Sequence, residues 1–346
     1  MKLGVSFWGI LAQSQARLAR LNEKITMSLS VSLGIHIVDV LLYPVTKIPG
    51  GQALAFVEQV RTTVAGSAAG TAIDMAKLGL KVHSIGAIGE DSRGDFLIST
   101  MQKFGVNTSG IVRKPQVETS CSVLPIRPSG ARPVWHLIGA NRKLTIEDID
   151  LSVIAKADFL HLGGTPLMEQ LDGEPASRIL RFAKEHGVIT TFDVLAVSTP
   201  NLTEMVNICL PYVDFFMPNY EEAVMICGLR GRQEIIRYFL DRGVKHTVLR
   251  MGENGSTIGM LEGGVLREIR TPAFDVPIVD STGCGDAYNA GFIKGLSLCW
   301  DLEKCAWLGC ACGGLVIQGL GSDAGIESFE STVEFARKTP TRPITD

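Results

Sequence analysis

A glycine-rich turn in the C-terminal part of the chain carries the residues best suited to chemistry. The run Asp280-Ser281-Thr282-Gly283-Cys284-Gly285-Asp286 precedes a helical stretch, so its small residues lie at the mouth of a helix. First-turn amides lack partners inside a helix, and with the helix dipole they can bind a phosphate. Asp286 falls in that first turn, where a carboxylate beside a phosphoryl group can accept the proton of an attacking hydroxyl. An ordinary strand-to-helix turn capped by an aspartate is the alternative interpretation.

A second candidate is an acid in an early apolar segment. Residues 28–42 alternate and then run apolar, which predicts one buried strand that contains Asp39. An unpaired buried carboxylate is costly, and open α/β sheets bind ligands at the carboxyl ends of their strands. We therefore expect Asp39 to contact a ligand.

The elements that must position these residues alternate along the chain. The pattern predicts strands at 81–88, 159–163, 188–194, 215–218 and 247–251, and helices at 68–78, 92–104, 176–186, 220–227, 285–298 and 302–318. This alternation is typical of an α/β fold with a mostly parallel sheet between helical layers.

Two regions, about 43–64 and 117–140, break the alternation. Strand-like runs at 118–125 and 133–138 flank a turn signal at 127–130, which predicts a projecting hairpin. With residues 45–64 it would form a small β lid over the carboxyl edge of the sheet. Because the hairpin carries apolar residues, we expect a homodimer through the lids; in the alternative, residues 45–64 cover the hairpin within one chain.

Composition excludes several classes of protein. The formal net charge of -3 and the pI near 6.1 give no reason to expect a nucleic-acid partner. The chain has no apolar run of membrane-spanning length, so we expect no membrane partner. Its 8 cysteines form no Cys-x-x-Cys pair, which favours reduced thiols in a cytoplasmic protein. None of the 6 histidines lies in a cluster, so none is a candidate ligand or base.

Residues 27–336 are expected to form the folded domain, followed by a tail at 337–346. Residues 1–26 could pass for a signal peptide, but we expect an extension outside the core.

The run 280–286 resembles the C-terminal signature of the ribokinase-like (PfkB) family of carbohydrate kinases, with Cys284 at a position usually held by Ala or Gly. Further segments resemble other motifs of the family in the same order: 34–39, 65–72, 89–94, 219–222, 250–255 and 319–322. The resemblance covers roughly residues 28–336 and implies a three-layer α/β/α fold with a small β lid.

The resemblance also implies a reaction and its site. ATP would donate its γ-phosphoryl group in line to a primary hydroxyl, with Asp286 as base and the amides of Gly283, Cys284 and Gly285 stabilising charge. Substrate contacts would come from Asp39, Gly66, Gly70, Asn141 and Asp286. Nucleotide contacts would come from Asn219, Glu222, Arg250, Gly252, Gly255, Thr282 and Gly321. Asn219 and Glu222 would hold Mg²⁺ through water, and Asp280 and Thr282 are candidates for a K⁺ site.

The acceptor stays open between a sugar and a nucleoside. Gly70 and Gly163-Gly164 stand where ribose-specific members carry polar contacts, which argues against ribose and for a larger acceptor. A non-catalytic sugar-binding relative would be expected to lose the base or the anion turn, and this chain has both. A dinucleotide dehydrogenase is disfavoured because no Gly-x-Gly-x-x-Gly follows an early strand, and no Gly-Lys-Ser/Thr marks a Walker site.

Overall fold

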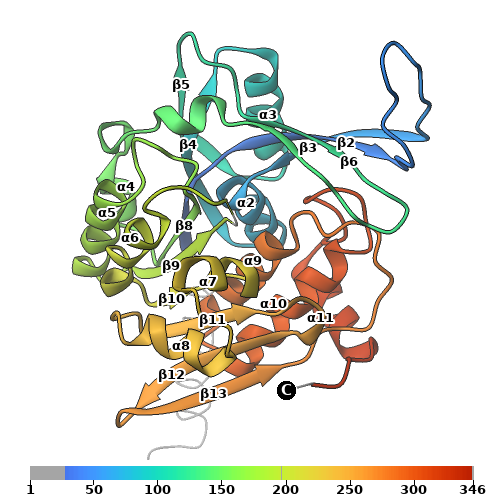
Figure 1. Ribbon diagram of the computed structural model, residues 1–346. Helices are drawn as coiled ribbons and strands as arrows, with labels where there is room; N and C mark the ends of the chain where they lie inside the picture. Colours follow the sequence, from blue (N-terminus) through green and yellow to red (C-terminus); the bar gives the residue numbers. More distant parts are fainter. Residues whose placement is uncertain (1–27, 196, 345–346) are drawn as a thin grey trace, which may run out of the picture.

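Helices pack on both faces of a nine-stranded sheet in this computed structural model, which describes residues 28–195 and 197–344 (Figure 1). The strand order is β13-β12-β11-β10-β9-β8-β1-β4-β5. The predicted N-terminal extension at 1–26 lies outside the described residues.

The sheet is parallel except at one edge. Its seven parallel strands are β1 (Leu29–Gly34), β4 (Lys81–Gly89), β5 (Asn107–Lys114), β8 (Phe159–Thr165), β9 (Ile189–Val194), β10 (Phe215–Phe216) and β11 (His246–Arg250). Two antiparallel strands, β12 (Ser256–Glu262) and β13 (Val265–Thr271), complete it. The central strands are buried on both faces, as expected where helices cover a parallel sheet.

The two helical layers enclose separate apolar cores. One layer contains α2 (Ser67–Lys77), α3 (Ser92–Lys103), α9 (Cys284–Ser297), α10 (Leu302–Val316) and α11 (Phe329–Lys338). The other contains α4 (Leu151–Ile154), α5 (Glu174–Glu185), α6 (Leu202–Asn207), α7 (Tyr220–Cys227) and α8 (Arg232–Leu240). Short 3-10 turns lie at η1 (Gly139–Lys143), η2 (Ile146–Asp148), η3 (Leu210–Tyr212) and η4 (Gly252–Asn254). The predicted three-layer α/β/α fold is confirmed.

The prediction of one strand over 28–42 is wrong, because the chain changes sheets in the middle. Gly34 has φ +145°, and a Cβ there would lie 1.8 Å from the carbonyl oxygen of Gly163. Only glycine permits this close approach. Beyond it, β2 (Ile37–Tyr43) pairs in a second sheet with β3 (Gln59–Ala65), β6 (Cys121–Pro125) and β7 (Trp135–Leu137).

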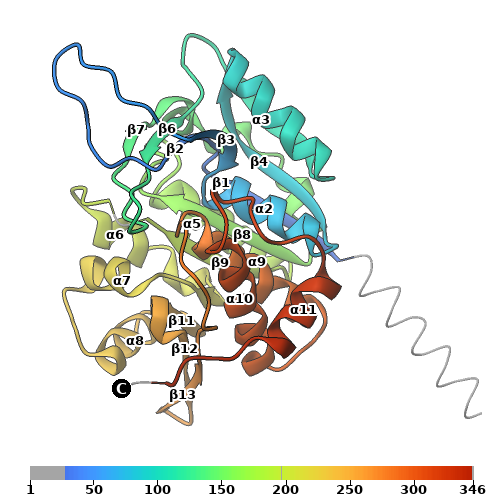
Figure 2. The ribbon, with the colours of Figure 1, turned by 90° about the vertical axis from the view of Figure 1, so that its right-hand side faces the viewer.

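This second sheet, of order β3-β2-β6-β7, projects from the body and is called the lid sheet below (Figures 1 and 2). The predicted hairpin is confirmed, since β6 and β7 pair antiparallel. Both predicted lid segments contribute strands, and β2 joins them. The alternative in which residues 45–64 cover the hairpin is wrong, because β3 occupies the opposite edge and Trp135 is 57% exposed.

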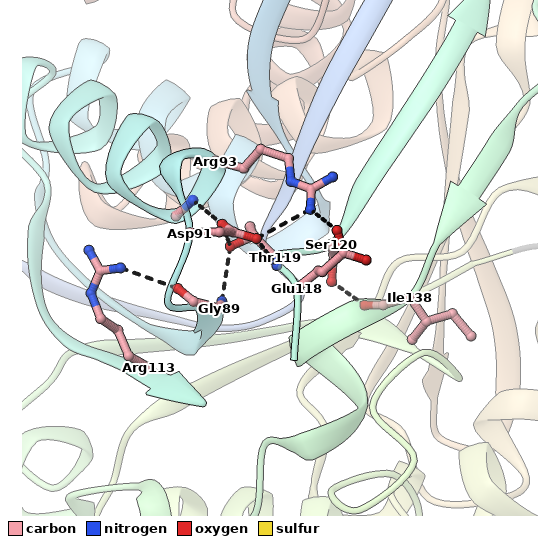
Figure 3. Close-up of polar contacts among 9 residues, drawn as sticks. Gly89, Asp91, Arg93, Arg113, Glu118, Thr119, Ser120 and Ile138 are labelled. Carbon is pink, nitrogen blue, oxygen red and sulfur yellow. Dashed lines mark hydrogen bonds and ion pairs between the residues drawn. The ribbon is translucent and has the colours of Figure 1, made fainter. Parts of the chain in front are cut away.

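A polar cluster fastens the lid hairpin to the body (Figure 3). Asp91 caps α3 by accepting from the Gly94 amide at 2.9 Å, and it accepts from the Thr119 amide at 2.8 Å and hydroxyl at 2.6 Å. Arg93 bridges Asp91 at 3.2 Å and Glu118 at 2.5 Å. Burial acts against ionisation, but these hydrogen bonds lower the pKa of Asp91 to about 2. The turn at residues 89–94 thus fixes the segment that enters β6.

The end of the described chain packs on the body. Thr341 forms an antiparallel bridge with Phe274, so the predicted tail does not leave the domain at residue 336. All 8 cysteines are free thiols. Over residues 28–195 and 197–344 we find no helix long and apolar enough to cross a bilayer.

Candidate active site

A cleft of about 890 Å³ lies between the lid sheet and the N-terminus of α9, at the carboxyl edge of the large sheet. Most of the predicted site residues line it: Asp39, Gly66, Asn219, Glu222, Arg250, Gly252, Gly255, Thr282, Gly283, Cys284, Gly285 and Asp286. Gly70, Asn141, Asp280 and Gly321 are not among the described residues that line the cleft.

The anion turn, residues 280–286, is shaped by its own first residue. Buried Asp280 accepts from the Thr282 amide at 3.0 Å and hydroxyl at 2.7 Å, and from the Gly321 amide at 2.9 Å. Gly283 then adopts φ +79° and starts α9, which places the first-turn amides at the cleft. Asp280 and Gly321 do not line the cleft themselves, but their hydrogen bonds fix the shape of the turn that does. The predicted K⁺ site at Asp280 and Thr282 stays a prediction.

A guanidinium lies directly against this turn. A Cβ on Gly285 would stand 2.2 Å from Nη1 of Arg250, so glycine at 285 admits the cation. Arg250 donates to Asp193 at 2.7 Å and to Glu222 at 3.4 Å, and Asn289 donates to the other oxygen of Asp193 at 2.6 Å. Burial raises the pKa of both acids, and the charge of Arg250 opposes it.

Asp286 extends from the first turn of α9 toward α2. Burial raises its pKa to about 7, the charge of Asp193 adds to the rise, and Arg250 acts against it. Thr71 donates to its carbonyl oxygen at 3.3 Å. A carboxylate with this pKa is well matched to accept a proton near neutral pH.

Gly70 lies in close contact with Asp286 and does not border empty space. A Cβ there would stand 2.9 Å from Oδ2 of Asp286, so the carboxylate of the candidate base occupies the volume that a side chain would fill. A Cβ on Gly163 would likewise lie 2.8 Å from Cβ of Ser67. The expectation that these glycines leave room for a larger acceptor is therefore wrong.

Three polar side chains form a row across the cleft face of the lid sheet. Asp39 on β2 is in register with Ser122 on β6, which is in register with His136 on β7. The Ser122 hydroxyl lies 3.1 Å from Nδ1 of His136, so it can accept from that ring while donating to Asp39. Burial raises the pKa of Asp39 to about 6, with Ser122 and the charge of Arg132 opposing. His136, which the sequence did not single out, lines the cleft with the predicted Asp39.

Arg132 joins the lid hairpin to the anion turn. Its Nε donates to the hydroxyl of Ser281 at 3.0 Å, and its side chain lines the cleft. Arg132 thus adds a second cation to the turn, at Ser281, while Arg250 lies against Gly285.

Asn141 has a scaffolding position. It is fully buried, and its amide accepts from the backbone N–H of His36 at 3.0 Å and donates to its carbonyl at 3.1 Å. The side-chain oxygen and nitrogen of Asn141 thus both bind the backbone of His36, in the segment that connects β1 to β2. The expected contact of Asn141 with the substrate is therefore corrected to a role in positioning β2, which carries Asp39.

Asn219 and Glu222 cap α7 reciprocally. The side chain of Asn219 accepts from the amide of Glu222 at 2.8 Å, and the side chain of Glu222 accepts from the amide of Asn219 at 2.7 Å. Both also line the cleft, so capping fixes them beside Arg250. Their expected contact with hydrated Mg²⁺ stays a prediction. Gly252 and Gly255, with φ +55° and +76°, form the turn that follows β11.

Sequence reasoning missed several polar residues that line the cleft, among them Arg132, His136, Asp193 and Arg342. Asp193 could have been found, because it stands at the carboxyl end of a predicted strand and meets the criterion that selected Asp39. The other three reach the cleft through strand pairing and the return of the C-terminal segment, which no local pattern reports.

Comparison with known proteins agrees with this geometry. Residues 27–328 match the pfkB family carbohydrate kinases. The chain is 28% identical over 285 residues to a 5-dehydro-2-deoxygluconokinase of Clostridium perfringens, covering 79% of this chain and 83% of the relative. It is 25% identical over 308 residues to a deoxyribokinase of Salmonella typhi, covering 88% and 97%. The structure of Arabidopsis thaliana ribokinase complexed with ribose and ATP has the same fold, with a TM-score of 0.74 and 20% identity over 90% of this chain and 99% of that one.

Proposed function

The chain belongs to the pfkB family of carbohydrate kinases and is a phosphotransferase with an alcohol acceptor; from this premise we propose that it transfers the γ-phosphoryl group of ATP to a primary hydroxyl of a sugar or sugar-like molecule. One observation carries the proposal. A carboxylate with its pKa raised to about 7, Asp286, stands beside the anion turn in a cleft that Asp39 faces from the lid sheet.

The acceptor would lie between the two aspartates. Asp39 accepts hydrogen bonds from its hydroxyls, and Asp286 takes the proton of the hydroxyl that attacks. The new bond joins that oxygen to the γ-phosphorus, while the bond from phosphorus to the oxygen of ADP breaks. The proton ends on Asp286 and the electron pair on ADP. Closure of the lid sheet over the acceptor would exclude water and so suppress ATP hydrolysis.

Negative charge on the transferring group would be met from three directions. The amides at the start of α9 would supply donors, Arg250 lies against Gly285, and Arg132 hydrogen-bonds Ser281 from the lid hairpin.

The same region suits a hydrated Mg²⁺. The buried carboxyl groups of Asp193 and Glu222 share a single guanidinium, and burial raises the pKa of Glu222 to about 8, so a cation bound nearby would favour the ionised form of Glu222. No group of acidic, histidine and cysteine side chains in the described part of the chain forms a complete metal cage. This arrangement fits an ion that keeps its waters and binds mainly through phosphates. Asn219 and Glu222 would hold the hydrated ion, and its charge would offset that of the phosphates.

The acceptor is best sought among sugars that lack a hydroxyl. Apolar side chains of Ile35, Leu167 and Leu195 line the cleft, so part of the acceptor meets groups that cannot hydrogen-bond. The two curated relatives are named for deoxy sugars, which supports the same choice. A nucleoside, which also has an apolar part, is the second candidate.

An ADP-release assay with matched acceptors tests the proposal. The panel contains 2-deoxyribose and ribose, 5-dehydro-2-deoxygluconate, fructose and adenosine, each with ATP and Mg²⁺ and each repeated with Asp286→Asn. We expect ADP release with a deoxy sugar, faster than with its hydroxylated counterpart and lost in the variant. Tight binding of a sugar without ADP release would identify a non-catalytic relative. Turnover with adenosine alone would identify a nucleoside kinase.

We further propose that two copies associate through the outer face of the lid sheet. Val60, Trp135 and Leu137 are 63%, 57% and 40% exposed there, in a sheet that projects from the body. Exposed apolar strands of this kind favour association with a second sheet. An enzyme that consumes ATP is expected in the cytoplasm.

A further inference from the structure

The C-terminal segment returns to the cleft at the end remote from the lid sheet. Thr341 pairs with Phe274, the amide of Asp275 donates to the carbonyl of Pro340 at 2.9 Å, and the amide of Arg342 donates to the carbonyl of Ala273 at 2.8 Å. Arg342 thereby becomes part of the cleft wall, together with Phe274. The segment expected to be a tail is thus held in place by backbone pairing.

Two consecutive glycines of α10 form the cleft wall between the anion turn and the C-terminal segment. A Cβ on Gly313 would stand 3.3 Å from the carbonyl oxygen of Cys284, and one on Gly314 would stand 3.4 Å from Cβ of Phe274. Both glycines line the cleft. A nucleotide with its phosphates at the anion turn would therefore extend past Gly313 and Gly314 toward Phe274 and Arg342.

The guanidinium of Arg342 is held by two acids. Its Nη1 lies 3.1 Å from Glu253, in the turn after β11, and its Nε lies 3.2 Å from Asp275. The Arg342 side chain is 29% exposed, whereas those of Glu253 and Asp275 are 74% and 63% exposed. Surface ion pairs of this kind add little stability. They do fix the plane of a guanidinium, and a planar guanidinium stacks on aromatic rings.

We propose that Arg342 is a specificity residue for the phosphoryl donor and closes the cleft over the heteroaromatic base of the nucleotide. This inference rests on the proposed use of ATP. Apolar residues beside it, Val276, Ile278 and Ile317, supply the remaining wall for a flat ring. Arg342 touches the base and leaves the phosphates to the anion turn and Arg250.

Calorimetric titration of the full chain with two probes tests the assignment. Mg-ADP carries base and phosphates, whereas Mg-pyrophosphate carries phosphates alone. Loss of a partly exposed cation–ring contact should weaken ADP binding by about 3- to 10-fold in Arg342→Ala. Pyrophosphate binding should stay within twofold of the unmutated protein. Arg342→Lys keeps the charge but lacks the planar group, so it should also lose ADP affinity.

The controls separate the possible failures. Arg337→Ala removes an exposed arginine of α11 that is not among the described residues lining the cleft, and it should leave both affinities unchanged. Should Arg342→Ala not fold, as judged by thermal unfolding, Arg342→Lys carries the test alone. Unchanged ADP affinity in the lysine variant overturns the inference, and so does an equal loss for both probes. If the unmutated chain binds pyrophosphate but not ADP, the proposed use of ATP fails instead.

Discussion

Replacement of Gly70 by alanine should separate activity from stability. Gly70 lies inside α2 with helical backbone, where alanine is preferred to glycine by about 0.5–1 kcal/mol. The new contact with Asp286 should cost a little stability, and the helix preference of alanine should balance or outweigh that cost. The free energy of unfolding should therefore be unchanged or rise slightly. Most substitutions that harm an enzyme by damaging its fold would lower that free energy instead.

The effect on turnover follows from one distance. The new Cβ would lie 2.9 Å from Oδ2 of Asp286, and ordinary contact begins at about 3.4 Å, so the carboxylate must move by about 0.5 Å. Because a displacement of about 1 Å can cost about 10²-fold, this shift predicts a fall in kcat of about tenfold. Affinity for Mg-ADP should be unchanged, because the anion turn and Arg250 are not displaced.

The assay is ADP release at saturating ATP and acceptor, measured for Gly70→Ala, Asp286→Asn and the double variant. If the alanine acts by moving the base, it should not slow the enzyme further once the base is gone, so the two effects should be strongly non-additive. An undiminished kcat in Gly70→Ala would refute the reasoning. So would a tenfold loss that persists on the Asp286→Asn background.

The remaining predictions concern the two aspartates and the lid. Asp286→Asn should lower kcat by about 10² to 10⁴ with little change in ADP affinity, and near-normal turnover would contradict its role as base. Since the pKa of Asp286 is raised to about 7 and the base must be unprotonated, kcat/KM should rise between about pH 6 and pH 8; a flat profile would count against it. Asp39→Ala should raise the acceptor KM by about tenfold or more and leave ADP affinity alone, whereas the opposite pattern would show that its role is misassigned. In light scattering, Trp135→Asp should convert a dimer into a monomer, and a monomeric unmutated protein would end the dimer proposal.

Local patterns predicted most strands of the large sheet, because each depends on neighbours in the chain, but they did not predict the edge strand β5. Helix α7 was predicted with its bounds, Tyr220–Cys227, and β4 and α3 to within one residue. The antiparallel edge formed by β12 and β13 was not predicted. Strand β13 is half-buried at the sheet's margin, and the buried part of β12 is the largely polar run 256–259, so neither strand shows a clear apolar pattern.

The sequence by itself determined the anion turn and singled out Asp286 as the candidate base and Asp39 as the candidate acceptor contact, because glycines at a helix mouth and an acid in an apolar run are visible in local order. Only the tertiary structure decided what surrounds them. Gly34 sends the chain from one sheet to the other, and strand register then sets Ser122 beside Asp39 and His136 beside Ser122. Whether a glycine leaves space or meets another chain segment, as Gly70 meets Asp286, depends on atoms more than 200 residues away in the chain. Such contacts arise from packing, and no spacing within one segment encodes them.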